Sequence, residues 1–213
     1  MKNKLFNQYD QASLAEIIYH RRDIRGNNFL STPLPQAILD QILLSAQLAP
    51  SVGLSQPWEF VIIRDKATKD VIAQNHQVEN DLAKEKFIES KQQLYSKLKL
   101  EGIKEAPINI AVFYKPSTEP VIGNNSMPEM GEYSVVCAIQ NMWLTARSLN
   151  VGLGWVSILA PEAVKQTLNA PKENKLIAYL CLGYVKEFLN VPELQTVNWL
   201  KREPLTLIDE SYT

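Results

Sequence analysis

Hydrophobic and polar positions recur with two different periods along this chain, and they predict helices interleaved with strands. Between Pro35 and Leu48 apolar side chains recur at helical spacing, and a proline suits the first turn of a helix. A capping-box pattern at residues 13–16 predicts that an earlier helix begins there and runs to His20. A short helix is expected at 161–168, and β-branched, apolar runs predict strands at 59–63, 108–114, 152–159 and 176–183. The interleaving indicates an α/β or α+β fold around one sheet.

Two further segments have helical patterns with contrasting surfaces. Segment 133–149 has apolar residues around nearly its whole circumference, so we expect it in a core or in a subunit interface. Segment 66–99 is highly charged, and its lysines mix with acids such as Asp81 and Glu85, which indicates a solvated helical face rather than a nucleic-acid patch. We therefore expect a single domain over residues 1–213, with a helical excursion or lid at about 66–104.

Composition and charge exclude several classes of partner. The 213 residues include 22 basic and 23 acidic side chains, so no overall field attracts nucleic acid or an anionic membrane. The N-terminal residues show no apolar signal region and no stretch reaches transmembrane length, so we expect a cytoplasmic protein. Cys137 and Cys181 both lie in apolar runs, which predicts reduced, packed thiols.

The strongest candidate for a binding site is the sequence Arg21-Arg22-Asp23-Ile24-Arg25. Three guanidinium groups so close together repel one another unless anions offset them, and a single aspartate does not suffice. Arginine is also the side chain best suited to bidentate recognition of phosphate. The local sequence therefore favours an anion-binding loop. The alternative is an exposed loop whose arginines pair with scattered surface acids.

Two other segments could carry chemistry. The loop at 49–58 is fixed by two prolines and Gly53, so it can hold backbone amides and Ser51 against a flat ligand; a plain turn is the alternative. At 152–158, glycines at the start of a strand suggest that the backbone approaches a ligand closely. Strand alternation would place Trp155 and Ser157 on one face, although an ordinary buried hydroxyl would also explain this serine.

Several familiar site patterns are missing from the sequence. It contains neither G-x-G-x-x-G nor a Walker A pattern, so a Rossmann or P-loop nucleotide site is unsupported. The missing G-x-S-x-G argues against an α/β-hydrolase nucleophile. His20 and His76 stand alone without ligand spacing, so no metal site is expected.

Taken together, six motifs in order along the chain resemble the nitroreductase superfamily, and most closely its branch of 5,6-dimethylbenzimidazole synthases, the BluB-type flavin destructases. The resemblance covers about residues 19–202, and the set is far more specific than any one motif. The motifs are Arg-Arg-Asp-x-Arg at 21–25, Ala-Pro-Ser-Val-Gly-x-x-Gln-Pro-Trp at 49–58, Leu-Lys-Leu-Glu-Gly-Ile at 98–103, Tyr-Ser with Ala-Ile-Gln-Asn at 133–141, Gly-Trp-Val-Ser-Ile at 154–158 and Tyr-Leu-Cys-Leu-Gly at 179–183.

This resemblance implies an α+β fold, a three-layer α-β-α sandwich, in an obligate homodimer that binds FMN at the subunit interface. The helix at 133–149 would be the central helix of the dimer. The phosphate and ribityl chain of FMN would be held by Arg21, Arg22 and Arg25, with Asp23 and Ile24 alongside. Further flavin contacts are expected from Ser51, Leu98, Ser157 and Arg202.

The branch is distinguished by Asp23, where general nitroreductases usually have serine, and by the serine of Gly-Trp-Val-Ser. Its reaction consumes reduced FMN and molecular oxygen, and it releases 5,6-dimethylbenzimidazole, the lower ligand of cobalamin, together with erythrose 4-phosphate. FMN is then a substrate, which a separate flavin reductase supplies in reduced form. We expect Asp23 to act as general base or acid and Ser157 to hydrogen-bond near the flavin N5. The alternative for Asp23 is an ion pair that only orders its arginines.

Two other functions compete with this interpretation. An NAD(P)H-dependent FMN nitroreductase or flavin reductase would retain its flavin and oxidise nicotinamide rapidly. A flavin storage protein would return FMN intact after exposure to air. The chain also departs from its relatives at two places, since Gly26-Asn27-Asn28 is one residue longer than usual and Asn124 replaces an expected arginine.

Overall fold

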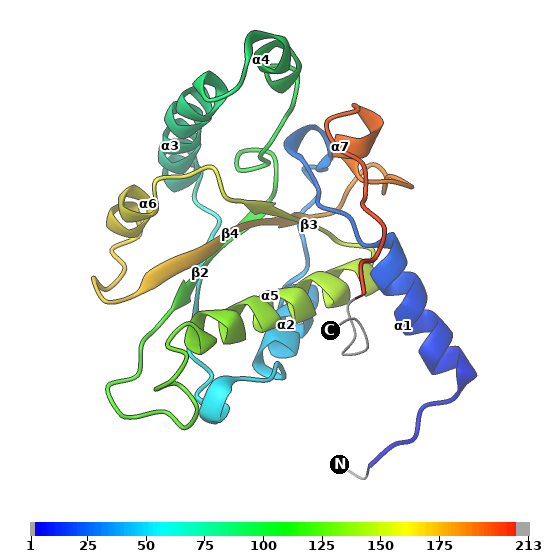
Figure 1. Cartoon of the computed structure of the whole chain (residues 1–213), viewed down its shortest axis with the longest axis vertical. Helices are drawn as coiled ribbons and strands as arrows, with labels where there is room; N and C mark the ends of the chain where they lie inside the picture. Colours follow the sequence, from blue (N-terminus) through cyan, green and yellow to red (C-terminus); the bar gives the residue numbers. More distant parts are fainter. Residues whose placement is uncertain (1–2, 208–213) are drawn as a thin grey trace.

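The computed structural model describes residues 3–207, and an antiparallel sheet of four strands lies at its centre (Figure 1). The strands are β1 (Trp58–Ile63), β2 (Ile108–Tyr114), β3 (Gly152–Val156) and β4 (Lys175–Gly183). Their order across the sheet is β1-β2-β4-β3, and Ile110 of β2 stands opposite Ile62 of β1 and Leu180 of β4. β3 is therefore an edge strand, whose outer side can accept another segment of chain.

Helices cover both faces of the sheet. On one face lie α2 (Gln36–Gln47) and α5 (Met130–Ser148), and on the other lie α3 (Lys66–Glu85) and α6 (Pro161–Thr167) (Figure 1). The remaining helices are α1 (Gln8–His20), α4 (Glu89–Tyr95), α7 (Glu193–Thr196) and two single 3-10 turns, Gly26–Asn28 and Val52–Leu54. No helix within residues 3–207 combines the length and the apolar character that crossing a membrane requires.

The side chains of β4 alternate between two hydrophobic cores, one on each face of the sheet. Leu180 and Leu182 belong to the core formed with α2 and α5, whereas Tyr179 and Cys181 belong to the core under α3 and α6. All four residues are fully buried. Burial of one leucine-sized side chain contributes about 1.5–3 kcal/mol, so this burial on both faces strongly specifies the register of the central strands.

Most predicted elements are confirmed, but the first helix begins earlier than its sequence pattern indicated. α1 starts at Gln8 because the side chain of Asn7 accepts the backbone N–H groups of Tyr9 and Asp10. Asp10 in turn accepts the Asn7 N–H at 3.1 Å, which completes a capping box upstream of the predicted one. The prediction of a start at 13–16 is therefore wrong. The strand expected at 152–159 is also shorter, since it ends at Val156.

Helix α5 is buried along one side and exposed along the other within the single chain. Tyr133 and Val136 are 51% and 40% exposed, and Cys137 is exposed with them. One chain alone therefore does not bury the whole circumference of this helix. Both cysteines are free, so the prediction of reduced thiols is confirmed. Cys181 is also packed as predicted, whereas Cys137 lies on the side of α5 that the single chain leaves uncovered. The fully buried residues of α5 are Val135, Ala138, Ile139, Met142 and Ala146.

Candidate active site

The arginine loop, residues 21–25, runs along the outer edge of β3. Asp23 forms a parallel bridge with Leu153, and the N–H of Ile24 donates to the Leu153 carbonyl at 3.2 Å. A side chain at Gly154 would collide with the carbonyl of Ile24. This glycine therefore admits a loop of the same chain, and its interpretation as a point of ligand approach is wrong.

A cavity of about 350 Å³ lies between the arginine loop and the C-terminal part of the described chain. Six of the predicted flavin ligands line it, namely Arg21, Arg22, Asp23, Ile24, Arg25 and Arg202. The other lining residues are Asn27, Asn28, Lys186, Glu187, Leu189, Pro192, Glu193 and Leu194. Five of these side chains are basic and three are acidic, so the cavity carries an excess of positive charge that suits an anion.

Two of the arginines already have partners within the protein. Arg22 is buried, and its guanidinium donates to three backbone carbonyls, those of Tyr19, Arg21 and Asn190. Arg25 pairs with Asp23 at 2.5 Å and donates to the carbonyl of Leu100 at 3.0 Å. These two guanidinium groups therefore hold the arginine loop against the segments around residues 100 and 190.

Arg21 and Arg202 differ from Arg22 and Arg25, because neither of them donates a hydrogen bond to a protein acceptor among residues 3–207. The guanidinium of Arg21 lies 4.6 Å from the ring centroid of Trp143, a cation–π contact that supports the side chain without using its donors. Burial chiefly, and also Arg202, lower the pKa of Arg21, although Asp23 raises it. Arg21 and Arg202 thus repel each other across the cavity, and a phosphate group bound between them would relieve that repulsion. Their guanidinium donors are also available to hydrogen-bond such a group.

Asp23 lies where the arginine loop, β3 and the cavity meet. Its Oδ1 accepts the backbone N–H of Trp155 at 2.9 Å, while Oδ2 pairs with Arg25. Burial raises the pKa of Asp23 above its usual range, although Arg25, the Trp155 N–H and Arg21 act in the opposite direction. Burial likewise raises the pKa of Glu193, which lines the same cavity. Such carboxyl groups can hold a proton at pH values where ordinary carboxyls have lost it.

Ser51 lies outside this cavity, near the opposite end of α5. The N–H of its neighbour Val52 donates to Ser134 Oγ at 3.0 Å, whereas Arg21 packs on Trp143. Positions 134 and 143 are roughly 14 Å apart along a helix axis, at 1.5 Å per residue. Positive φ angles occur in this loop at Gly53, Leu54 and Gln56. Such angles are rare outside glycine. The Oγ of Ser51 accepts the N–H of Gln56 at 3.1 Å, so this hydroxyl helps to hold its own loop, and a flavin contact from Ser51 stays a prediction.

Ser157 and Leu98 also lie outside the arginine-lined cavity. Ser157 follows the end of β3, is exposed, and lines a separate hollow of about 560 Å³ beside α3. It stands two residues beyond Trp155, whose N–H binds Asp23, so its backbone is roughly 7 Å further along. Leu98 is half-buried in the segment after α4. The single chain therefore gathers the arginines and Asp23 but not these two residues.

Three residues join the candidate site to which the sequence analysis had assigned no role there. Trp143 supports Arg21, Leu100 supplies a carbonyl to Arg25, and Glu193 faces the cavity from α7. Glu193 follows Pro192, and a proline that begins a helix was an available signal for it. Neither of the other two contacts has a local signature, because each joins segments about 75 or more residues apart in the sequence.

Comparisons with known proteins agree with this geometry. The model of the nitroreductase family matches residues 18–184. The 5,6-dimethylbenzimidazole synthase of Rhodospirillum rubrum is 40% identical over 202 residues, which cover 94% of this chain and 95% of that protein.

Two solved structures have the same fold at low identity. Oxidised iodotyrosine deiodinase bound to FMN and 3-iodo-L-tyrosine superposes with a TM-score of 0.71 at 22% identity, covering 94% of this chain and 98% of that one. A BluB-like flavoprotein from Clostridium difficile 630 superposes with a TM-score of 0.69 at 22% identity, covering 92% of this chain and 99% of that one. The predicted nitroreductase-like α+β fold is confirmed. The chain belongs to the nitroreductase family and, within it, to the branch of the 5,6-dimethylbenzimidazole synthases.

Proposed function

We propose that this protein fragments reduced FMN with molecular oxygen to give 5,6-dimethylbenzimidazole and erythrose 4-phosphate. The observation that carries the proposal is the 40% identity, over 94% of the chain, to the 5,6-dimethylbenzimidazole synthase of Rhodospirillum rubrum. The position of Asp23 supports it, because this carboxyl group with a raised pKa lies inside the arginine-lined cavity. The NAD(P)H-dependent nitroreductase remains the alternative that the experiment below separates.

The residues of the cavity fit the phosphate end of FMN. Arg21 and Arg202 line it with donors that no described protein group uses, and phosphate accepts such donors in pairs. Arg22 and Arg25 donate hydrogen bonds to other groups of the protein, so we assign them chiefly to shaping the loop. We place Ile24 beside the ribityl chain, since it lines the same cavity.

Asp23 is the group that we assign to proton transfer. When bound, reduced FMN supplies the electrons that oxygen takes up and the ring atoms of the product. One carboxyl oxygen of Asp23 accepts the Trp155 N–H and the other pairs with Arg25, so the carboxyl group is fixed in orientation. A positioned proton-transfer group typically contributes about a hundred- to ten-thousand-fold in rate. We assign Ser157 a hydrogen bond near the reacting part of the flavin ring.

A homodimer of three-layer α-β-α sandwiches would explain why Ser51 and the arginines lie apart in one chain. We propose that FMN binds at the subunit interface, with the arginines from one chain and the loop of the partner subunit's Ser51. The exposed apolar side of α5 supports this arrangement, as Tyr133 and Val136 together offer surface that a second copy can bury. We further propose that the chain is one domain, residues 1–213, in which 66–104 form a lid carrying Leu98. A cytoplasmic location stays a prediction.

The decisive experiment uses FMN that has been photoreduced without oxygen and mixed with an equal amount of protein. Admission of air should convert the flavin to 5,6-dimethylbenzimidazole, measured by chromatography with mass spectrometry, with no reductase present. The substitution Asp70→Asn, at an exposed ion pair, should leave the yield unchanged. Full recovery of FMN would contradict the proposal and favour storage. Repeated NAD(P)H oxidation with intact flavin would favour a nitroreductase.

The composite site can be tested by mixing two defective proteins. Arg21→Ala removes phosphate donors, and Ser51→Trp fills the space in front of its loop. A heterodimer of these two variants contains one intact site if each site combines both chains, so activity should return on mixing. No recovery, with heterodimers demonstrated by tagged pull-down, would place both residues in a site within one chain.

A further inference from the structure

A chain of polar contacts joins Asp23 to the segment at residues 99–105, at the end of the proposed lid and shortly before β2. Asp23 pairs with Arg25, and Arg25 donates to the carbonyl of Leu100 at 3.0 Å. The next carbonyl, that of Glu101, accepts the N–H of Gly26 at 2.7 Å. Two consecutive carbonyls of this segment therefore hold the end of the arginine loop.

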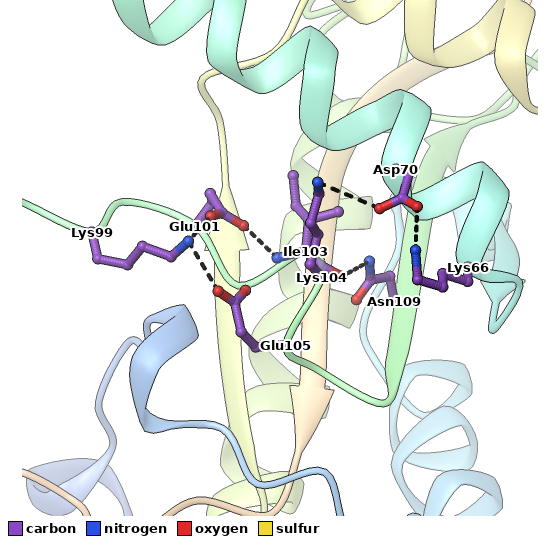
Figure 2. Close-up of polar contacts among 8 residues, drawn as sticks. All are labelled: Lys66, Asp70, Lys99, Glu101, Ile103, Lys104, Glu105 and Asn109. Carbon is purple, nitrogen blue, oxygen red and sulfur yellow. Dashed lines mark hydrogen bonds and ion pairs between the residues drawn. The ribbon is translucent and has the colours of Figure 1, made fainter.

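The side chain of Glu101 fixes the shape of this segment. Glu101 is 8% exposed, and its Oε2 accepts the N–H of Ile103 at 2.6 Å (Figure 2). Its other oxygen pairs with Lys99, and Lys99 also pairs with Glu105 at 3.0 Å. Figure 2 shows Lys99 reaching both carboxylates from one side. The carboxylate of Glu101 thus stabilises the turn at residues 101–103 and links it to Lys99, the neighbour of Leu100.

The two segments pack closely against each other at two glycines. A Cβ atom at Gly26 would lie 2.8 Å from the carbonyl oxygen of Glu101 and 2.7 Å from Lys99 Cε. A Cβ atom at Gly102 would likewise lie 2.6 Å from the ring of Phe29. Displacement of the turn must therefore shift the arginine loop or break the hydrogen bonds from Arg25 and Gly26.

We propose that Glu101 is a positioning residue for Asp23, acting through Leu100 and Arg25. The carboxylate of Glu101 sets the turn, the turn presents the Leu100 carbonyl to Arg25, and Arg25 so oriented holds the carboxyl group of Asp23. The catalytic consequence of this arrangement rests on the proposed function, but the coupling itself does not. It can be measured in the protein without flavin.

Other titratable groups also face the two carboxyl groups. Asp23 is faced by Arg21 and Arg25 from its own loop, by Glu193 of α7 and by Cys181 of β4. Glu101 is faced by Lys99, Glu105, His76 of α3 and Cys181. Among the neighbours of Asp23, Arg25 is the one that the Glu101 turn holds directly, through Leu100. A loosened turn should therefore weaken the hold of Arg25 and raise the pKa of Asp23.

The test follows the backbone amide of Trp155, whose N–H donates to Asp23 and whose nitrogen and proton shifts report the titration of that carboxyl group. In flavin-free Glu101→Gln, the midpoint should rise by roughly half a pH unit, about threefold in proton affinity. Lys104→Met is the matched control, since Lys104 lies in the same segment but pairs outward with Asp70 at 3.4 Å (Figure 2). It should leave the midpoint unchanged.

Lys99→Met provides a second perturbation of the same turn. It should raise the midpoint too, and the double variant Lys99→Met with Glu101→Gln should shift it by less than the sum of the two single shifts. Circular dichroism shows whether each variant is folded. If Glu101→Gln does not fold, the midpoint in Lys99→Met tests the positioning role. An unchanged Trp155 midpoint in a folded variant overturns the positioning role. If the variants shift the Trp155 midpoint as expected but the wild-type protein forms no 5,6-dimethylbenzimidazole, the proposed function alone is overturned.

Discussion

Two carboxylates of this protein sit among cations, yet their surroundings push their pKa values in opposite directions. Asp70 pairs with Lys66 at 2.7 Å and with Lys104 at 3.4 Å on the surface of α3 (Figure 2). The hydrogen bond from Lys66 chiefly, together with the charges of both lysines, lowers the pKa of Asp70. Asp23 pairs with Arg25 at 2.5 Å, but burial raises its pKa.

The difference shows that a charge pattern does not define a site until the packing around the charged groups is known. The side chains of Asp70 and Asp23 are exposed to nearly the same extent, 31% and 30%, but their cationic partners differ, because Lys66 and Lys104 are exposed and Arg25 is mostly buried. Water therefore screens the lysine pairs at Asp70, and such pairs contribute little. The arginine loop is packed against β3 and encloses a cavity, so ionisation of Asp23 is costly despite its nearby cations. Only the second arrangement leaves a carboxyl group suited to proton transfer.

The largest effect is expected from Asp23→Asn. The rate of product formation should fall about a hundred- to ten-thousand-fold because the proton-transfer group is lost, while the arginines that we assign to phosphate binding remain. Single-turnover formation of 5,6-dimethylbenzimidazole and FMN binding by fluorescence separate the two effects. Asp70→Asn should match the wild type in both measurements. Equal rates of product formation in Asp23→Asn and wild type would reduce Asp23 to an ion-pair partner of Arg25.

Arg21→Ala should weaken FMN binding by about tenfold to a hundredfold, because hydrogen bonds to charged groups contribute about 1.5–3 kcal/mol. Equilibrium titration followed by flavin fluorescence measures the change, and the salt dependence of binding should become shallower. Lys66→Ala is the matched control, since it removes a cation of the lysine cluster. A similar loss of affinity in that variant would show that only the overall charge matters.

Arg22→Ala should act mainly on folding rather than on FMN. Its guanidinium is buried and satisfies three backbone carbonyls, so we expect a loss of about 1–3 kcal/mol in the free energy of unfolding. Urea denaturation of the flavin-free protein measures it. Normal stability combined with lost FMN affinity would instead make Arg22 a direct phosphate ligand.

The smallest effects concern the pH dependence of stability, and here the two aspartates should have opposite signs. The pKa of Asp23 is raised in the folded state, so this group favours folding when protonated, and that contribution is lost as the pH rises through its folded pKa. At neutral pH, flavin-free Asp23→Asn should therefore melt no lower than the wild type. The pKa of Asp70 is lowered, so its contribution is present above its unfolded pKa and is lost as the pH falls through the folded one.

Scanning calorimetry at a series of pH values compares Asp23→Asn and Asp70→Asn with the wild type. The stability of Asp23→Asn relative to the wild type should grow from acidic pH upward and then level off. Parallel curves for the two variants would show that Asp23 is as well solvated as Asp70, and the comparison between the two clusters would then fail.

The sequence alone determined the interleaved helices and strands, because their hydrophobic periods are local properties of the chain. It also identified residues 21–25 as an anion-binding candidate, since three guanidinium groups within five residues repel one another and favour an anion nearby. The ordered motifs predicted the family, which the comparisons confirm. By contrast, the local pattern at 13–16 misplaced the start of α1, because Asn7 and Asp10 form a competing cap that the pattern did not rank.

Only the tertiary structure decided which of the predicted ligands have donors available and which lie together. Arg22 and Arg25 use donors on carbonyls far along the chain, such as Asn190 and Leu100, and no local pattern encodes those contacts. The raised pKa of Asp23 depends in the same way on the atoms that exclude water from it. Periodicity and charge are written in neighbouring residues, whereas burial and donor satisfaction arise only when distant segments pack together.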